Sequence, residues 1–280
     1  MVKLDQQQTR HGADLRFADR GGNSDLAVVF THGAGYDHSM FDVQARALEL
    51  AGYRVIVWDL RGHGKSALHA GARFTATDAL DDLAWLIEHT GPGRPTLIGH
   101  SLGGNLSQAF VRAHPQRVSG LIVLDSTWNA GPLTRVERLG LRAAAPMLGL
   151  IPASSLPRLM ARASAASAEA ISEAEAVFAR MPKRVFLDVW RETASLVAPD
   201  PAYRTPVPLT LIRGALDRTG NISTAMPRWA EAEGIAEHVV PQAGHLVTLD
   251  APDATTQTLL HLLGQWHPPL PPFEGARDDG

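Results

Sequence analysis

The chain alternates between short apolar runs and longer segments in which apolar residues recur with helical spacing. Runs rich in Val, Ile and Leu predict strands over residues 26–31, 53–58, 95–100, 118–124, 207–213 and 237–240. Helical spacing predicts helices over residues 40–50, 77–89, 102–114 and 251–266. Continuous apolar strands separated by helices are typical of a mostly parallel sheet that helices cover on both faces. The pattern therefore predicts an α/β fold.

The N-terminal stretch adds two strands to this prediction. Residues 8–19 carry His11-Gly12 between two short runs, which indicates a small antiparallel hairpin leading into the sheet. With the hairpin included, we expect a sheet of eight strands, most of them parallel.

The alternation stops in the middle of the chain. Between residues 127 and 204 there is no buried-strand pattern, only Ala-rich helical segments interrupted by Pro132, Pro146, Pro152, Pro157, Pro182 and Pro201. This segment predicts a helical cap over residues 128–205, inserted between core segments 1–127 and 206–266. Residues 267–280 hold four prolines beside charged residues and predict an extended, flexible tail.

Composition narrows the classes of protein to consider. A chain of 280 residues with 45% hydrophobic residues is long enough for one large core with an insertion. Its 26 basic and 29 acidic residues are scattered, so a nucleic-acid partner is not expected. No apolar run approaches the roughly 18 residues that cross a bilayer, and no signal-peptide core is visible. With no cysteine, disulfides and thiolate chemistry are excluded, and we expect a cytoplasmic protein with no membrane partner.

The strongest chemical signal is the sequence Gly-His-Ser-Leu-Gly at residues 99–103, between a predicted strand and a predicted helix. This is the context of a nucleophile elbow, in which a serine stands on a sharp turn. Small residues two positions before and after the serine let strand and helix pass closely. The sequence thus predicts Ser101 as a nucleophile.

A serine hydroxyl needs a base to take its proton and a carboxylate to orient that base. His245 follows the last predicted strand, and Asp217 follows the strand before it, so both would reach the carboxyl edge of the sheet. The resulting order along the chain is Ser, Asp, His. Asp125, which ends the strand after the elbow, is the alternative triad acid. The neighbouring His32 and His100 adjoin buried strands and are expected to be structural.

These motifs together resemble the α/β-hydrolase superfamily, in its capped branch of esterases, epoxide hydrolases and dehalogenases, over roughly residues 13–266. Residues 31–35, Thr-His-Gly-Ala-Gly, are similar to the family's oxyanion segment, which implies that the N–H groups of Ala34 and Leu102 form an oxyanion hole. Residues 59–66 resemble a structural turn of the family. A serine nucleophile separates the chain from the epoxide hydrolases and haloalkane dehalogenases, which the resemblance implies use aspartate there.

Several residues are candidates for the walls of a substrate pocket. His38 and Met40 follow the oxyanion segment, which itself contains Gly33, and Trp128 follows the Asp125 strand. From the cap, large side chains such as Phe178 and Trp190 are further candidates, although many cap side chains are expected to pack on one another.

The predicted activity is hydrolysis of a small-molecule ester, most simply an apolar one, through an acyl-enzyme on Ser101. The mechanism requires no metal and no organic cofactor. A hydrolase of carbon–carbon bonds, a lactonase and a cofactor-free perhydrolase could use the same triad. Outside enzymology, the alternative is a small-ligand receptor on a hydrolase fold. The sequence carries no signal for the oligomeric state.

Overall fold

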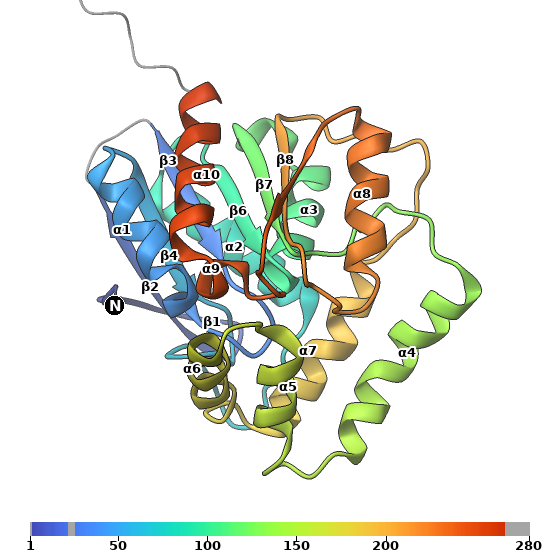
Figure 1. The fold of residues 1–280 in the computed structure, drawn as a ribbon. Helices are drawn as coiled ribbons and strands as arrows, with labels where there is room; N and C mark the ends of the chain where they lie inside the picture. The colour runs from blue at the N-terminus through green and yellow to red at the C-terminus, as the bar shows by residue number, and fades with distance from the viewer. Residues whose placement is uncertain (1, 22–25, 267–280) are drawn as a thin grey trace, which may run out of the picture.

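The computed structural model describes residues 2–21 and 26–266, and a nine-stranded sheet forms their centre (Figure 1). Its main path runs β1-β2-β4-β3-β6-β7-β8-β9, and β5 pairs with β2 off this path. β1 and β2 are antiparallel to their neighbours, whereas the pairs from β4 to β9 are parallel. The strands are β1 (Gln6–Arg10), β2 (Ala13–Arg20), β3 (Ala27–Thr31), β4 (Arg54–Asp59), β5 (Ala67–Leu68), β6 (Thr96–His100), β7 (Gly120–Leu124), β8 (Leu209–Gly214) and β9 (Glu237–Val240).

The α/β prediction is confirmed, and the main path has the eight strands expected. The hairpin turns at His11 and Gly12, whose φ angles are 42° and 73°. Several short elements and one longer helix have no counterpart in the sequence pattern, among them β5, which has only two residues, and helix α8, which contains Pro227. A proline within a segment argues against a helix in sequence, and a two-residue strand has no periodicity to detect.

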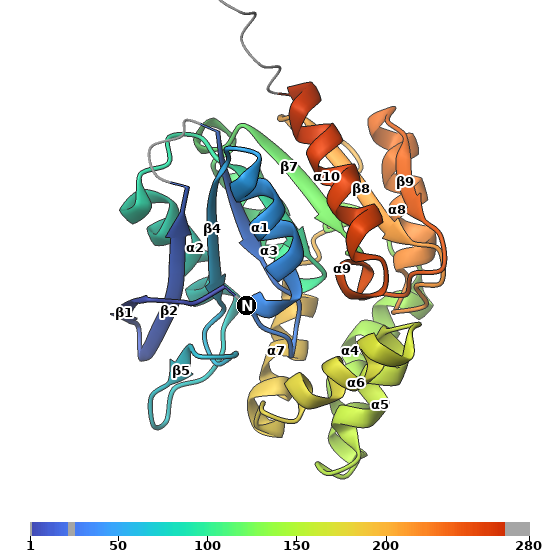
Figure 2. The same ribbon diagram turned by 60° about the vertical axis from the view of Figure 1, so that its left-hand side comes forward.

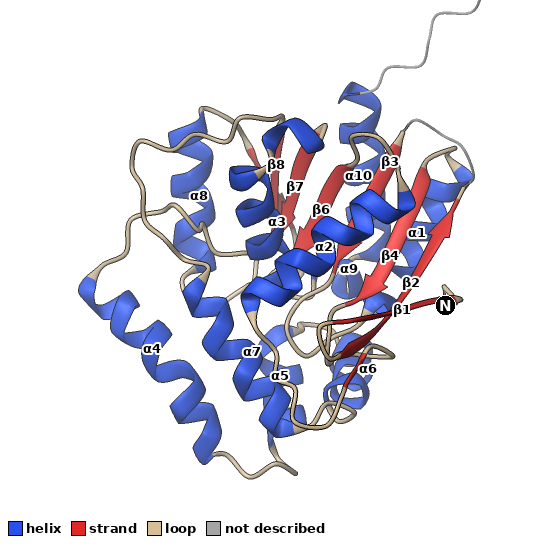
Figure 3. Cartoon of the chain, turned by 180° about the vertical axis from the view of Figure 1, so that it is seen from behind, coloured by secondary structure: helices blue, strands red, loops and turns tan. Residues whose placement is uncertain are grey.

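Helices cover both faces of the sheet. Helices α1, α9 and α10 lie on the face seen in Figure 1, and α2, α3 and α8 lie on the face seen from behind in Figure 3. Alternate residues of a strand point to opposite faces, so Val28 and Phe30 of β3 join one core cluster while Val29 joins the other. The helices of this core are α1 (Asp42–Leu50), α2 (Ala76–Thr90), α3 (Leu102–Ala113), α8 (Ile222–Glu233), α9 (Val247–Asp250) and α10 (Pro252–Trp266), with 3-10 turns η1 (His38–Phe41) and η2 (Pro115–Arg117).

Four helices lie between β7 and β8, where the cap was predicted, and they gather beyond the carboxyl ends of the parallel strands (Figure 2). They are α4 (Arg135–Leu150), α5 (Leu156–Ser164), α6 (Ala168–Phe178) and α7 (Lys183–Ser195). Helix α5 packs on α6, and α4 packs on α7. The tail predicted for residues 267–280 lies outside the described residues. Within the described part of the chain, no helix is long and apolar enough to span a membrane.

Candidate active site

Ser101 occupies a strained turn between β6 and α3. Its φ and ψ angles are 50° and −116°, in a region that non-glycine residues rarely adopt. The backbone is held by Ser101 N donating to Leu124 O at 2.9 Å and by Ser126 Oγ donating to Ser101 O at 2.8 Å. A Cβ atom added at Gly99 of β6 would collide with the carbonyl oxygen of Gly103 in α3. The strand and helix therefore meet as closely as a nucleophile elbow requires.

Two backbone amides point to an anion site beside Ser101. Leu102 is the first residue of α3, so its N–H has no partner within the helix and lies at the positive end of the helix dipole. Ala34 follows β3, and in the described part of the chain neither its amide nor that of Leu102 donates to another group. Both residues line the cavity that contains Ser101. This arrangement can hold the oxygen of a reacting carbonyl.

His32 holds the oxyanion segment in place. Its Nδ1 lies 2.8 Å from Gly33 O, and its Nε2 accepts a hydrogen bond from Leu60 N at 2.9 Å. The ring therefore carries its proton on Nδ1, which donates to Gly33. Burial, with the neighbouring His63, lowers the pKa of His32 to about 3, so the ring stays neutral.

His245 forms its side-chain hydrogen bond with Asp217 rather than with Asp125. His245 Nδ1 lies 3.0 Å from Asp217 Oδ2, and both side chains are buried. Burial alone would raise the pKa of Asp217, but the nearby His245 and the hydrogen bonds from His245 and Thr219 lower it to about 2. A carboxylate that stays ionised can hold the imidazole with its proton on Nδ1, leaving Nε2 free to act as a base.

Asp125, the alternative triad acid, has a different environment. It sits at the end of β7 with a φ of 42°, and its Oδ1 accepts a hydrogen bond from Gly214 N at 2.8 Å. Complete burial and the adjacent Asp217 carboxylate raise the pKa of Asp125 well above its usual range. Its hydrogen bond thus braces the end of β8, from which the Asp217 loop departs.

His100 supports the loop that carries the base. Its Nε2 donates to the backbone oxygen of His245 at 2.7 Å, and the two rings lie 4.8 Å apart. Burial, with the neighbouring His245, lowers the pKa of His100 to about 3. This hydrogen bond agrees with the structural role that the sequence predicts for His100.

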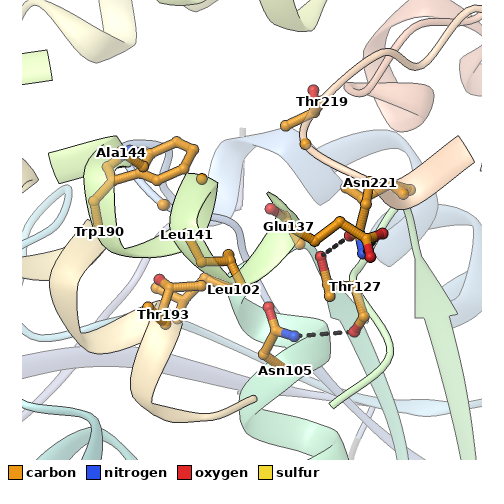
Figure 4. A pocket seen from close by; sticks show the side chains of 16 residues that line it. Leu102, Asn105, Thr127, Glu137, Leu141, Ala144, Trp190, Thr193, Thr219 and Asn221 are labelled. Atoms are coloured by element: carbon orange, nitrogen blue, oxygen red, sulfur yellow. Dashed lines mark hydrogen bonds between the residues drawn. The ribbon is translucent and has the colours of Figure 1, made fainter. Parts of the chain in front are cut away.

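Two cavities meet at Ser101. The large cavity has a volume of about 320 Å³, with apolar walls from Leu102, Leu141, Ala144, Trp190 and Ile222. Figure 4 shows polar side chains on its other side, among them Asn105, Thr127, Glu137, Thr219 and Asn221. The small cavity has a volume of about 40 Å³ and is lined by Ser101 and His245 together with Tyr36, Met160, Ser164 and Phe178.

Three of the predicted pocket residues lie at these cavities and three do not. Gly33 and Phe178 line the small cavity, and Trp190 lines both. The cavity linings at Ser101, as far as the described residues show them, do not include His38, Met40 or Trp128.

The three corrections have physical reasons. His38 is buried, with Nδ1 at 2.7 Å from Asp59 Oδ1 and Nε2 at 3.0 Å from Val2 O, so its ring is fixed away from the cavities. Met40 is 1% exposed and belongs to the core cluster under α1 and α10. Trp128 stacks on Trp229 with ring centroids 6.1 Å apart.

Sequence reasoning missed most of the large cavity. Glu137, Leu141 and Ala144 come from α4, while Thr219 and Asn221 come from the loop after Asp217. The helical spacing of α4 predicts a helix but not which side faces Ser101. The loop residues carried no signal beyond their proximity to Asp217.

Among the described residues, two groups of side chains bring three potential metal ligands together, with ligand atoms within 4.8 Å: Asp125 with Asp217 and His245, and Asp37 with His38 and Asp59. In each group, a histidine is hydrogen-bonded to a carboxylate. Asp59 accepts from His38 through Oδ1 and from Lys65 N through Oδ2 at 2.7 Å. The first group is joined by the His245–Asp217 bond. We therefore assign no metal to either.

A sequence profile of the alpha/beta hydrolase family matches residues 28–258. A relative from Burkholderia vietnamiensis, named 2-hydroxy-6-oxononadienedioate/2-hydroxy-6-oxononatrienedioate hydrolase, is 35% identical over 128 residues, which are 43% of this chain and 43% of that protein. The chain thus aligns with less than half of that curated relative.

Solved structures are similar over nearly the whole chain. A thermophilic esterase from Thermogutta terrifontis has a TM-score of 0.76 and 27% identity, covering 91% of this chain and 94% of that one. The enol-lactonase from Burkholderia xenovorans has a TM-score of 0.73 and 21% identity, covering 92% and 99%, and shares the fold.

Proposed function

The chain belongs to the alpha/beta hydrolase family, and from this we propose that it cleaves a small-molecule carboxylic ester through an acyl-enzyme on Ser101. The observation that carries the proposal is the His245–Asp217 hydrogen bond at 3.0 Å, with His245 lining the same small cavity as Ser101. The similarity to the Thermogutta terrifontis esterase supports ester chemistry.

In the proposed reaction, His245 takes the proton of Ser101 while Oγ attacks the carbonyl carbon of the ester. The carbonyl oxygen becomes negative and accepts hydrogen bonds from the N–H groups of Ala34 and Leu102, each contributing about 3 kcal/mol to the transition state. His245 then donates its proton to the departing alcohol. A water molecule repeats these steps on the acyl-enzyme and releases the acid.

The large cavity favours an apolar acyl or ring group over a dianion. Leu141, Ala144 and Trp190 form apolar walls, and Glu137 supplies a carboxylate. Over the described residues, neither cavity at Ser101 is lined by a lysine or an arginine. A dioate such as the substrate in the name of the Burkholderia vietnamiensis relative would meet no cation there, and burying an unpaired carboxylate is costly.

A fluorophosphonate tests the proposal directly, because it reacts covalently with an activated serine. We expect mass spectrometry to find the label on Ser101 when the folded protein is treated with the probe. We expect no label there when the protein is unfolded in acid before the probe is added. An unlabelled Ser101 in folded protein would rule out the acyl-enzyme. A panel of esters, lactones and vinylogous diketones, with peroxide-dependent halogenation measured alongside, separates the reactions that share this triad. Ligand-induced stabilisation without turnover would instead identify a receptor.

A further inference from the structure

The two cavities that meet at Ser101 differ greatly in size. The large cavity measures about 320 Å³ and the small one about 40 Å³. A single water needs about 10–15 Å³ of space measured with a water-sized probe. The small cavity therefore has room for a group of about three heavy atoms, the size of ethanol, whereas the large one accepts a chain or a ring.

The chemistry decides which half of an ester enters each cavity, provided that the proposed function holds. The departing alcohol takes its proton from His245, so its oxygen must lie beside that ring. His245 lines the small cavity and not the large one, among the residues described. Leu102 lines the large cavity and Ala34 lines both, so the proposed oxyanion hole lies where the two cavities meet, and the acyl group extends from it into the larger space. The alcohol thus belongs in the small cavity and the acyl group in the large one.

The turn between helices α5 and α6, which covers the small cavity, is hydrogen-bonded to the loop that carries His245. We call it the pinned turn. Leu246 N donates to Ser164 O at 2.9 Å, and the carboxylate of Asp250 accepts from Ala166 N at 2.9 Å, Ser167 N at 2.8 Å and Gly244 N at 2.8 Å. These bonds join the α5–α6 turn to both sides of His245. The α5–α6 turn cannot move away from His245 unless they break.

Aromatic packing closes the same cavity from the side. Phe178 meets Tyr36 edge to face at 5.9 Å, and the Tyr36 hydroxyl donates to Glu173 of α6 at 3.2 Å. Phe178 is buried, at 7% exposure. A longer alcohol would have to displace this ring from its contact with Tyr36.

We propose that the protein is selective for esters of a long or bulky apolar acid with a small alcohol of the size of methanol or ethanol. The selectivity is set on the alcohol side by Phe178, Met160 and the pinned α5–α6 turn.

Two constitutional isomers test the orientation. Methyl heptanoate and hexyl acetate have the same atoms, but the long chain lies on the acyl side in one and on the alcohol side in the other. We expect kcat/KM for methyl heptanoate to exceed that for hexyl acetate by about tenfold or more, since even one misplaced methylene changes kcat/KM by about 10-fold or more. Equal rates or a preference for hexyl acetate would overturn the inference.

Substitutions in the wall of the small cavity test whether it holds the alcohol group. Phe178→Ala should raise kcat/KM for butyl heptanoate relative to methyl heptanoate by about tenfold. Met160→Ala, at a partly buried position, should act in the same direction and provides a second reading if Phe178→Ala fails to fold. The matched control is Leu141→Ala in the large cavity, which should leave the ratio of butyl to methyl ester unchanged. An unchanged ratio in folded Phe178→Ala and Met160→Ala, or a rise in Leu141→Ala, would refute the assignment.

Fluorophosphonate labelling of the same preparations separates this inference from the proposed function. The probe loses fluoride, a leaving group small enough for the small cavity. A labelled Ser101 without preference for methyl heptanoate overturns the orientation alone. An unlabelled Ser101 overturns the hydrolase mechanism, and the orientation with it.

Discussion

The α5–α6 part of the cap and helix α4 cover the two cavities at Ser101 in different ways. The α5–α6 turn is hydrogen-bonded to the loop around His245. Helix α4 has Ala145 as its single buried residue and exposes Val136, Leu139 and Leu150 to solvent. A segment held by hydrogen bonds fixes the size of the cavity that it covers, whereas a loosely packed helix can shift to fit the group bound beneath it. The difference suggests a strict alcohol side and a tolerant acyl side.

The largest effect is expected from a substitution in the proposed triad, beside the small cavity. Asp217→Asn would keep the shape of the site but favour the wrong tautomer of His245, and kcat on methyl heptanoate should fall about 10⁴-fold. Circular dichroism should show an intact fold. Steady-state turnover gives the measurement.

Asp125→Asn is the matched control for that variant. Burial and Asp217 raise the pKa of Asp125 well above its usual range, and the amide oxygen of asparagine can still accept the hydrogen bond from Gly214 N, so kcat should fall far less than in Asp217→Asn. A loss as large as that of Asp217→Asn would make Asp125 the working acid of the triad.

Removing the hydrogen bonds of the pinned turn should lower the free energy of unfolding and relax the selectivity for small alcohols. Asp250→Ala removes the acceptor shared by Ala166 N, Ser167 N and Gly244 N. Hydrogen bonds to a charged group contribute about 1.5–3 kcal/mol each in favourable cases, and we expect a loss of about 2–3 kcal/mol in the free energy of unfolding. Urea denaturation measures it, and the ratio of butyl to methyl heptanoate turnover should rise.

The control for Asp250→Ala is Asp253→Ala, at an exposed position in the first turn of α10. It should cost no more than about 0.3–1 kcal/mol through the helix dipole and leave the ester ratio unchanged. If Asp250→Ala lowers stability without relaxing alcohol selectivity, the pinned turn does not set the size of the small cavity.

The same contrast explains what could be predicted from the sequence. The core strands have local apolar patterns, and Ser101, Asp217 and His245 follow strands that the pattern located, so their meeting at one sheet edge follows from the topology. His38 and Trp128 also follow strands, but a carboxylate at Asp59 and a ring at Trp229 take their side chains elsewhere. Such long-range partners leave no local signal.

The cavity walls were harder to predict for a related reason. Helices α4 to α7 are recognisable as helices, but which of their faces cover Ser101 depends on tertiary contacts such as those of Asp250. The size of the small cavity depends on hydrogen bonds between residues about 80 positions apart in the chain. Sequence periodicity carries no information on such pairs.

The smallest effect is expected on the loosely packed side. Glu137 forms a capping box with Thr134 at the start of α4, and its Oε1 accepts from Asn221 Nδ2 of the core at 3.0 Å. Glu137→Ala removes both interactions and should destabilise α4 by about 1 kcal/mol. Hydrogen exchange at the amides of α4 should become faster, while the ratio of butyl to methyl ester turnover stays the same.

Glu137→Gln preserves the capping box, because glutamine serves at the third helical position as glutamate does. It should therefore retain most of the protection from exchange that Glu137→Ala loses. A change in alcohol selectivity in either variant would mean that α4 and the α5–α6 turn move together, and the division of the cap into a pinned and a yielding part would fail. With selectivity unchanged, the acyl cavity can open at α4 while the surroundings of His245 keep their geometry.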